Sequence, residues 1–440
     1  MEPSAVERLQ ALIRIPTVSS RDPEAVDHAS FDAFLRTLRE LYPRLHADLE
    51  VTSVERHGLL VRWPGRSSEA PVVLMAHLDV VPVADTDPWT RPAFGGDLVD
   101  GAVWGRGTLD DKGALTAICE AVEALLEEGF VPARDVWLSF GCDEEVSGSA
   151  ARAAAVRLTS RGVRPWFVLD EGGAVAHGAF PGVGTPVAVI GVAEKGTTSL
   201  LLRATGRGGH ASTPRRLGPT ARIARAVSRL DASPMPSRLP DTTAVMLARL
   251  APHAKLPLRS LLARAGRIGP VVARALVAAG PESAAMTRTT FALTTLEGSP
   301  ALNVIAATAT AGVNVRILVG DTVDDAVRHV RRAIADRRVE IEVVERGEPS
   351  PVSPLDDAFR LLERTVAGVF PDAVPAPYIM MAATDSQFFT GLCDRVYRFV
   401  PFRMTKEQRA SIHSFDEHLE VEAFLDGITW YRRLLEGLPS

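Results

Sequence analysis

The 440-residue sequence is poor in cysteine, in lysine and in long apolar runs. Its three cysteines, Cys119, Cys142 and Cys393, are too few and too scattered for a disulfide framework or a cysteine-rich zinc site. No stretch reaches the roughly 20 apolar residues that a membrane-spanning helix needs. The start of the chain also lacks an apolar core of signal-peptide length. We therefore expect a cytoplasmic protein with no membrane partner.

The sequence also lacks an excess of positive charge. Its formal net charge is -5, which provides no electrostatic footprint for nucleic acid. Only four of the residues are lysines, so arginine carries almost all the positive charge. With 46% hydrophobic and 23% charged residues the composition is that of a globular protein, and a chain of this length predicts two domains.

Polar clusters follow two apolar runs in the first half of the chain. The run 72–76 precedes His77-Leu-Asp79, and the run 136–140 precedes Asp143-Glu144-Glu145. Between them lies Gly105-Arg-Gly-Thr-Leu-Asp110-Asp-Lys-Gly113. Zinc binds imidazole nitrogen and carboxylate oxygen, and one carboxylate bridges two ions that lie about 3.5–4 Å apart in hydrolytic sites. The pattern predicts a hydrolytic metal site with Asp110 as the bridge.

The directions in which neighbouring side chains point suggest different roles for the acidic residues of this site. Glu144 and Glu145 are adjacent, so one can bind a metal while the other faces the substrate as a general base. Asp79 lies two residues after His77 and is expected on the same strand face, where it accepts the proton of the second imidazole nitrogen.

The periodicity of the chain predicts an α/β fold. Apolar strand-like runs alternate with helix-like segments up to about residue 170, which is typical of a mostly parallel sheet covered on both faces. Ligand sites in such sheets lie at the carboxyl ends of the strands, where His77 and the Glu144–Glu145 pair are expected. From about Lys195 the pattern becomes strand, helix, two strands, helix and strand.

Further motifs extend these clusters along the chain: Leu169-Asp170-Glu171-Gly-Gly, Gly208-Gly-His210-Ala-Ser and Ser411-Ile-His413-Ser. Together with the motifs at 77–79, 105–113 and 143–145 they resemble the dizinc family of aminoacylase, acetylornithine deacetylase, succinyl-diaminopimelate desuccinylase and carboxypeptidase S. The order and spacing are most similar to the carboxypeptidase S branch, and the motifs span nearly the whole chain.

The resemblance implies two zinc ions per chain, with cobalt or manganese as possible substitutes. It assigns Glu144 as the general base, with Asp79 supporting the site, and a cis peptide bond after Asp110. The implied metal ligands are His77, Asp110, Glu145, Asp170 and His413. The assignment of Asp170 is open, because relatives use either the aspartate or the glutamate of a similar Asp-Glu pair as the metal ligand. We favour Asp170 over Glu171.

The resemblance also implies an inserted ferredoxin-like lid or dimerisation domain. It divides the chain into 1–194 and 348–440, which form the catalytic domain, and 195–347, which forms the lid with an extra basic helical segment at about 252–282. On the lid, His210 is expected to stabilise the oxyanion, and Asn303 and Arg316 to bind the substrate's carbonyl or carboxylate. A homodimer through the lid is possible.

Ordinary structural readings compete with several of these assignments. Asp110 and Asp111 would also suit a helix N-terminus, the two glutamates a solvated surface, and His413 a loop, with His418 as a competing ligand. Gln387 stands where relatives have an arginine that binds a substrate carboxylate, which leaves the substrate open.

We therefore expect a metal-dependent hydrolase that cleaves an N-acyl amino acid or small peptide with a metal-bridging water and Glu144 as the base. One alternative is a biosynthetic deacetylase or desuccinylase that uses the same site. Another is a catalytically inactive metal-binding subunit that acts in assembly.

Overall fold

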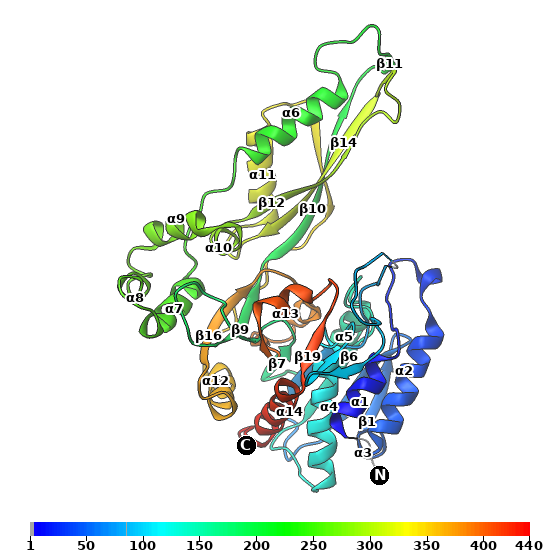
Figure 1. Cartoon of the computed structure of the whole chain (residues 1–440), viewed down its shortest axis with the longest axis vertical. Helices are drawn as coiled ribbons and strands as arrows, with labels where there is room; N and C mark the ends of the chain where they lie inside the picture. The colour runs from blue at the N-terminus through cyan, green and yellow to red at the C-terminus, as the bar shows by residue number, and fades with distance from the viewer. Residues whose placement is uncertain (1–3, 85) are drawn as a thin grey trace.

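The computed structural model describes residues 4–84 and 86–440, which form two lobes (Figure 1). The larger lobe is built on a 10-stranded sheet in the order β1-β2-β6-β3-β7-β17-β9-β8-β18, with β16 also paired to β9. The strands, in that order, are β1 (Glu50–Val54), β2 (Gly58–Trp63), β6 (Val136–Gly141), β3 (Val72–His77), β7 (Phe167–Asp170), β17 (Val396–Arg398), β9 (Val187–Glu194), β8 (Val175–Ala176), β18 (Arg403–Met404) and β16 (Val374–Met380).

The centre of this sheet is parallel and fully buried. Strand β3 pairs in parallel with β6 and β7, and β7 pairs in parallel with β17. Every residue of β3 and β6 is buried, as expected for apolar strands with helices on both faces. Because the strands run the same way, His77, the segment after Gly141 and Asp170 all emerge at one edge. The predicted α/β class is confirmed.

Helices cover both faces of the large sheet. One face carries the main apolar core, formed by helices α1 (Ala5–Ile13), α2 (His28–Leu41), α3 (Pro43–Asp48), α4 (Lys112–Glu127), α12 (Asp357–Val369) and α14 (Val421–Glu436). A second core lies between the other face and α5 (Ser149–Ser160) with the short helix η3 (Asp385–Phe389). All three cysteines are free.

The smaller lobe contains a four-stranded antiparallel sheet in the order β12-β14-β10-β15. Its elements follow the predicted βαββαβ order: β10 (Gly196–Thr205), α6 (Pro219–Asp231), β12 (Thr290–Glu297), β14 (Thr308–Ile317), α11 (Val323–Ile334) and β15 (Val339–Glu345). Helices α6 and α11 bury their apolar stripes against this sheet. We call this lobe the lid.

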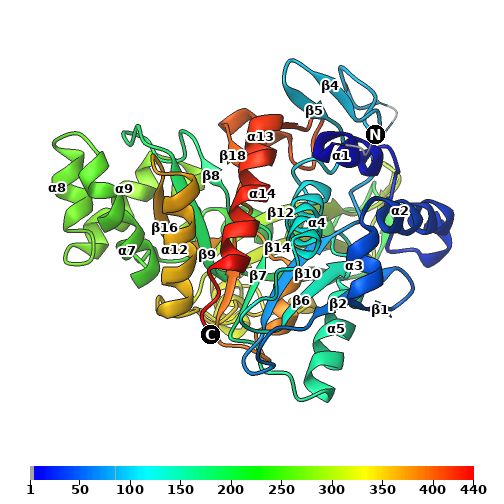
Figure 2. The same cartoon turned by 90° about the horizontal axis from the view of Figure 1, so that it is seen from below.

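The insertion in the lid differs from the prediction. The helices occupy a longer stretch than 252–282: they are α7 (Asp241–Leu250), η2 (Ala251–His253), α8 (Leu258–Ala263), α9 (Gly269–Ala279) and α10 (Pro281–Ala285). Their apolar side chains, including Met246 and Leu250, pack with Val187 and Ala376 of the large sheet. Figure 2 shows α7 beside β16. The insertion thus covers the edge strand β16 of the larger lobe, which would otherwise expose unpaired backbone groups.

Several short elements complete the chain. They are η1 (Pro23–Ala25), the sheet β19-β5-β4 with β4 (Asp97–Val99), β5 (Ala102–Trp104) and β19 (His418–Glu420), the pair β11 (Gly209–His210) and β13 (Val304–Ile305), and α13 (Lys406–Ser411). Across the described residues, no helix has both the length and the apolar character needed to cross a bilayer.

The core beneath the carboxyl edge of the large sheet depends on Trp430 of α14, which is fully buried and packs edge-on against Phe399. We expect Trp430→Ala to lower the free energy of unfolding by about 3–5 kcal/mol, because it removes a large buried ring and leaves a cavity. The same substitution at Leu425, which is 46% exposed on the same helix, should change it by less than about 0.5 kcal/mol. Denaturant unfolding of both variants tests this, and equal effects would contradict it.

Candidate metal centre

His77 and Asp110 meet at the carboxyl edge of the large sheet. His77 is the last residue of β3, and Asp110 lies in the loop that leads into α4. Nε2 of His77 lies 2.9 Å from Oδ1 of Asp110. On the other side of the ring, Nδ1 lies 3.0 Å from the backbone oxygen of Asp79 and 3.4 Å from its Oδ1. Asp79 therefore faces the second nitrogen from beyond the strand's end, not from within the strand.

Asp110 connects two histidines from opposite ends of the chain. Its Oδ2 lies 3.0 Å from Nε2 of His413, which in turn lies 3.0 Å from Oε2 of Glu145. Burial raises the pKa of Asp110, but hydrogen bonds to His413 and His77 outweigh it and hold the pKa below its ordinary value. A carboxylate with one imidazole at each oxygen has the arrangement of a group that bridges two metal ions. The Asp110–Asp111 peptide is cis.

Three sets of side chains at this edge bring their ligand atoms within 4.8 Å of one another. The sets are His77 with Asp110 and Glu171, Asp110 with Glu145 and His413, and His77 with Glu144 and Glu145. The first two share only Asp110. They therefore form two adjoining positions, each with one histidine, one carboxylate of its own and the common aspartate.

Asp170, which we favoured as a metal ligand, does not lie with the other expected ligands. In the part of the chain that the structure describes, Asp170 belongs to none of these sets, whereas Glu171 does. Asp170 ends β7, and its Oδ2 accepts a hydrogen bond of 2.8 Å from the backbone N–H of Ser386. Adjacent residues at a strand end point in opposite directions, so only one of the two acids reaches His77. We accordingly replace Asp170 by Glu171 in the proposed ligand set.

The site concentrates negative charge in a buried place. Burial, with a further contribution from neighbouring carboxylates, raises the pKa values of Asp111, Glu144, Glu171 and Asp385 well above the ordinary range. Oδ1 of Asp111 is buried and has no hydrogen-bond partner among the described residues. A bound cation would offset the buried negative charge and would provide a partner for unpaired carboxylate oxygens. The imidazole and carboxylate donors therefore fit two divalent ions of the zinc type.

Asp79 also orients the two glutamates. It is fully buried, and its two carboxylate oxygens accept hydrogen bonds from the backbone N–H groups of Glu144, at 3.1 Å, and Glu145, at 3.2 Å. These bonds fix the turn after β6. The turn places Glu145 beside His413 and leaves Glu144 beside His77.

Glu417 holds the loop that carries Asp110, and the sequence analysis did not identify it. This buried carboxylate accepts hydrogen bonds from the backbone N–H groups of Gly107, Leu109 and Asp110, at 3.1, 2.8 and 3.2 Å. Its other oxygen lies 2.6 Å from Nη1 of Arg106. No local pattern in the sequence pointed to Glu417, because its partners lie about 310 residues away along the chain.

A second buried network was also missed. Arg398 is fully buried and its Nε donates to Glu194 at 2.9 Å. The same glutamate oxygen accepts from the backbone N–H of Thr384, at 3.0 Å, and from its hydroxyl, at 2.8 Å. Glu194 ends β9 directly before the lid strand β10, so this network joins the base of the lid to the segment at 384–387.

Two residues that were considered in the sequence have local roles here. The ring of His418 stacks on Trp104, with 4.2 Å between ring centroids, and its Nδ1 lies 2.8 Å from the backbone oxygen of Asp416. Gln387 donates to the backbone oxygen of Thr384 at 3.2 Å. Neither belongs to a set of potential metal ligands in the described residues.

The three predicted lid residues lie apart from the metal ligands. His210 is exposed in β11 at the far end of the lid (Figure 1), where its neighbour Ala211 donates to the backbone oxygen of Asn303. Arg316 is half-buried on β14, with Nη1 donating to Thr197 at 2.7 Å and Nε to Asn314 at 3.2 Å. In this conformation none of the three joins the ligand sets.

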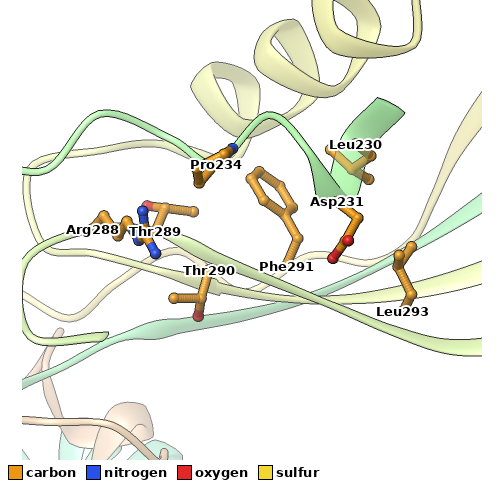
Figure 3. Close-up of a pocket in the computed structure, with 8 residues that line it drawn as sticks. All are labelled: Leu230, Asp231, Pro234, Arg288, Thr289, Thr290, Phe291 and Leu293. Carbon is orange, nitrogen blue, oxygen red and sulfur yellow. The ribbon is translucent and has the colours of Figure 1, made fainter. Parts of the chain in front are cut away.

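A small hollow on the lid lies away from this chemistry. It measures about 180 Å³ and lies between the end of α6 and the start of β12 (Figure 3). Leu230, Pro234 and Phe291 are among the residues that line it, and none of the predicted site residues does.

Comparison with known proteins places the chain in a family. Residues 73–437 match Peptidase family M20/M25/M40. The chain is 34% identical to the probable carboxypeptidase S-like 2 of Dictyostelium discoideum, over 98% of this chain and 84% of that protein. It is 35% identical to the human N-fatty-acyl-amino acid synthase/hydrolase PM20D1, over 99% of this chain and 88% of that protein.

Solved structures show the same fold. The M20 family metallo-carboxypeptidase Sso-CP2 of Sulfolobus solfataricus matches with a TM-score of 0.72 and 16% identity, over 99% of both chains. The Bacillus subtilis YXEP protein, described as a dinuclear metal binding peptidase from the M20 family, matches with a TM-score of 0.61 and 14% identity, over 99% of this chain and 98% of that one. The chain therefore belongs to peptidase family M20/M25/M40 and is a metallopeptidase- or amidohydrolase-type enzyme.

Proposed function

We propose that the protein hydrolyses the amide bond of N-acyl amino acids or small peptides at a two-zinc centre. The observation that carries this proposal is the position of Asp110 between His77 and His413, which creates two adjoining metal positions. His77, Asp110 and Glu171 would hold one ion, and Asp110, Glu145 and His413 the other. The names of the relatives, a carboxypeptidase and an N-fatty-acyl-amino acid hydrolase, support this substrate class.

The bound ions would supply Lewis-acid polarisation of the amide carbonyl and activation of a water molecule. Glu144 would accept a proton from the attacking water and donate it to the amide nitrogen as the C–N bond breaks. Burial and the nearby carboxylate of Asp385 raise the pKa of Glu144, which favours its acting as both base and acid. The carboxylate of Asp79 keeps Glu144 in place by accepting a hydrogen bond from the backbone N–H of Glu144.

The lid would supply the substrate contacts. The guanidinium of Arg316 suits a carboxylate because its fork donates two parallel hydrogen bonds, and Asn303 and His210 offer further polar groups to a carbonyl. Closure of the lid, or pairing of two lids in a homodimer, would be needed to bring His210 to a metal centre.

The biosynthetic deacetylase or desuccinylase alternative uses the same residues with another acyl group. The inactive assembly subunit is disfavoured, because the proposed base and a full set of ligands lie together.

Hydrolysis of a panel of short- and long-chain N-acyl amino acids and free dipeptides tests the proposal. We expect zinc-loaded protein to cleave at least one class, a chelator to abolish cleavage, and added zinc to restore it, because both metal positions lie at the reacting edge. The acyl group selected separates the first alternative from our proposal. Two bound metals without any cleavage would contradict hydrolysis and support the assembly subunit.

Replacement of the base should separate chemistry from metal binding. We expect Glu144→Gln to keep two metals per chain and to lower kcat by about 10²–10⁴-fold, because general acid–base catalysis is lost. The matched control is Glu127→Gln at the exposed end of α4, which should leave kcat unchanged. Measured metal content and turnover of both variants decide the point, and normal turnover in Glu144→Gln would remove this residue from the mechanism.

Loss of the loop support should act through the metal. Because Glu417 anchors the backbone of Asp110, we expect Glu417→Gln to weaken zinc binding by about 10–100-fold, as is usual for groups that orient a ligand. Glu420→Gln, on an exposed residue of the same segment, serves as the control. Competition with a chromophoric chelator measures both affinities. Equal affinities would show that the loop holds its shape without this carboxylate.

A further inference from the structure

A hollow of about 480 Å³ opens at the tip of the lid, where the segment between β10 and α6 meets β13. Both residues of β11 line it, and Figure 1 shows this strand at the far end of the lid. Its lining contains no Asp or Glu, but it contains six basic side chains: Arg207, His210, Arg215, Arg216, Arg222 and Arg338. We call this hollow the lid-tip pocket.

Most of the positive charge in the lid-tip pocket is uncompensated. Arg222 pairs with Asp336 and also donates to the backbone oxygen of Leu217. The other four arginines are exposed and form no ion pair with any residue in 4–84 or 86–440. The segment 206–230 contains six arginines and no acidic residue, in a chain whose net charge is -5. An anion that enters this hollow would be attracted by the combined charge.

Backbone features of the pocket also favour an anion. Gly206, Gly208 and Gly209 line it and have no side chain that would keep a ligand from the backbone. The 13-residue helix α6 begins at its border with Gly218 at the N-cap and no side chain capping the first N–H groups. The positive end of the helix dipole therefore adds to the charge of the arginines.

We propose that the lid-tip pocket binds the acidic part of the substrate, a small organic group with at least one carboxylate beyond the one that all N-acyl amino acids share. This inference rests on the proposed hydrolase function and narrows its substrate class to N-acyl amino acids whose side chain carries a carboxylate. Two of the four unpaired guanidinium groups would suffice to bind two carboxylates with two parallel hydrogen bonds each, and the other two would add to the attraction. A single monovalent ion would leave most of this charge unbalanced.

Two further observations connect the pocket with the reaction. His210, the residue expected to contact the reacting carbonyl, lines the same hollow as the arginines. The family resemblance implies an arginine at the position of Gln387, and the segment at 384–387 contains no cationic residue. The lid tip therefore supplies positive charge that the segment at 384–387 does not.

Direct binding provides the first test. Isothermal titration of glutarate into zinc-loaded protein compares the wild type with Arg215→Ala/Arg216→Ala and with Arg331→Ala/Arg332→Ala. The second pair removes the same charge from exposed positions of α11 that do not line the pocket. We expect the Kd to rise at least about tenfold in the first variant and less than about twofold in the control, since charge-assisted hydrogen bonds are lost only there. Any binding of glutarate to the zinc ions is common to all three proteins. Equal Kd values would overturn the proposal.

Kinetics provide the second test and separate this inference from the proposed function. The substrates are an N-acyl-L-glutamate and its amide isostere, the N-acyl-L-glutamine, with the acyl group that the panel selects. We expect the wild type to prefer the glutamate, and Arg215→Ala/Arg216→Ala to lose that preference at least about tenfold, mainly through KM. Arg215→Lys/Arg216→Lys should retain part of this preference, because lysine keeps the positive charge but cannot donate two parallel hydrogen bonds, and retention of any preference excludes misfolding as the cause of the loss in the alanine variant. Zinc-dependent cleavage without a preference for glutamate would overturn the inference and leave the hydrolase function standing.

Discussion

One carboxylate, Asp110, constrains the arrangement of the whole catalytic edge. Its two oxygens face His77, at the end of β3, and His413, in the loop after α13. For both contacts to form, the parallel sheet must end in register, the loop after β5 must fold back over it, and the last part of the chain must return to the same edge. Two buried carboxylates stabilise this arrangement through backbone hydrogen bonds. Glu417 holds the loop, and Asp79 holds the turn that carries Glu144 and Glu145.

The concentration of buried acids is destabilising in itself. Taking carboxylates out of water is unfavourable unless hydrogen bonds or cations compensate them. Backbone N–H groups compensate Asp79 and Glu417, and Arg398 compensates Glu194. Asp111 accepts one backbone hydrogen bond, from the N–H of His77 at 3.2 Å, whereas the carboxylates of Glu144 and Glu171 accept none from residues 4–84 and 86–440, and burial raises the pKa of all three well above the ordinary range. Carboxylates that are already hydrogen-bonded hold the backbone of the site, whereas those that lack partners would be stabilised by a bound metal ion. Metal binding is therefore expected to stabilise the folded form of this edge.

The sequence predicted the parts of the structure that local patterns determine. Apolar runs identified β3 and β6, and the period of α11 identified the lid helix, because these elements bury regular faces. Patterns did not reveal features that depend on distant contacts. The choice between Asp170 and Glu171 depends on Ser386, the role of Glu417 depends on the loop at 106–110, and the packing of the insertion depends on β16. The location in the cytoplasm, the exact domain boundaries and a dimer through the lid stay predictions.

Anomalous diffraction at the zinc edge from crystals of zinc-loaded protein tests the central claim most directly. The account predicts two peaks on either side of Asp110, one contacting His77 and Glu171 and the other contacting His413 and Glu145. The separation should be about 3.5–4 Å, as in other two-metal hydrolytic sites. A single peak, or two peaks that do not share Asp110, would contradict the account.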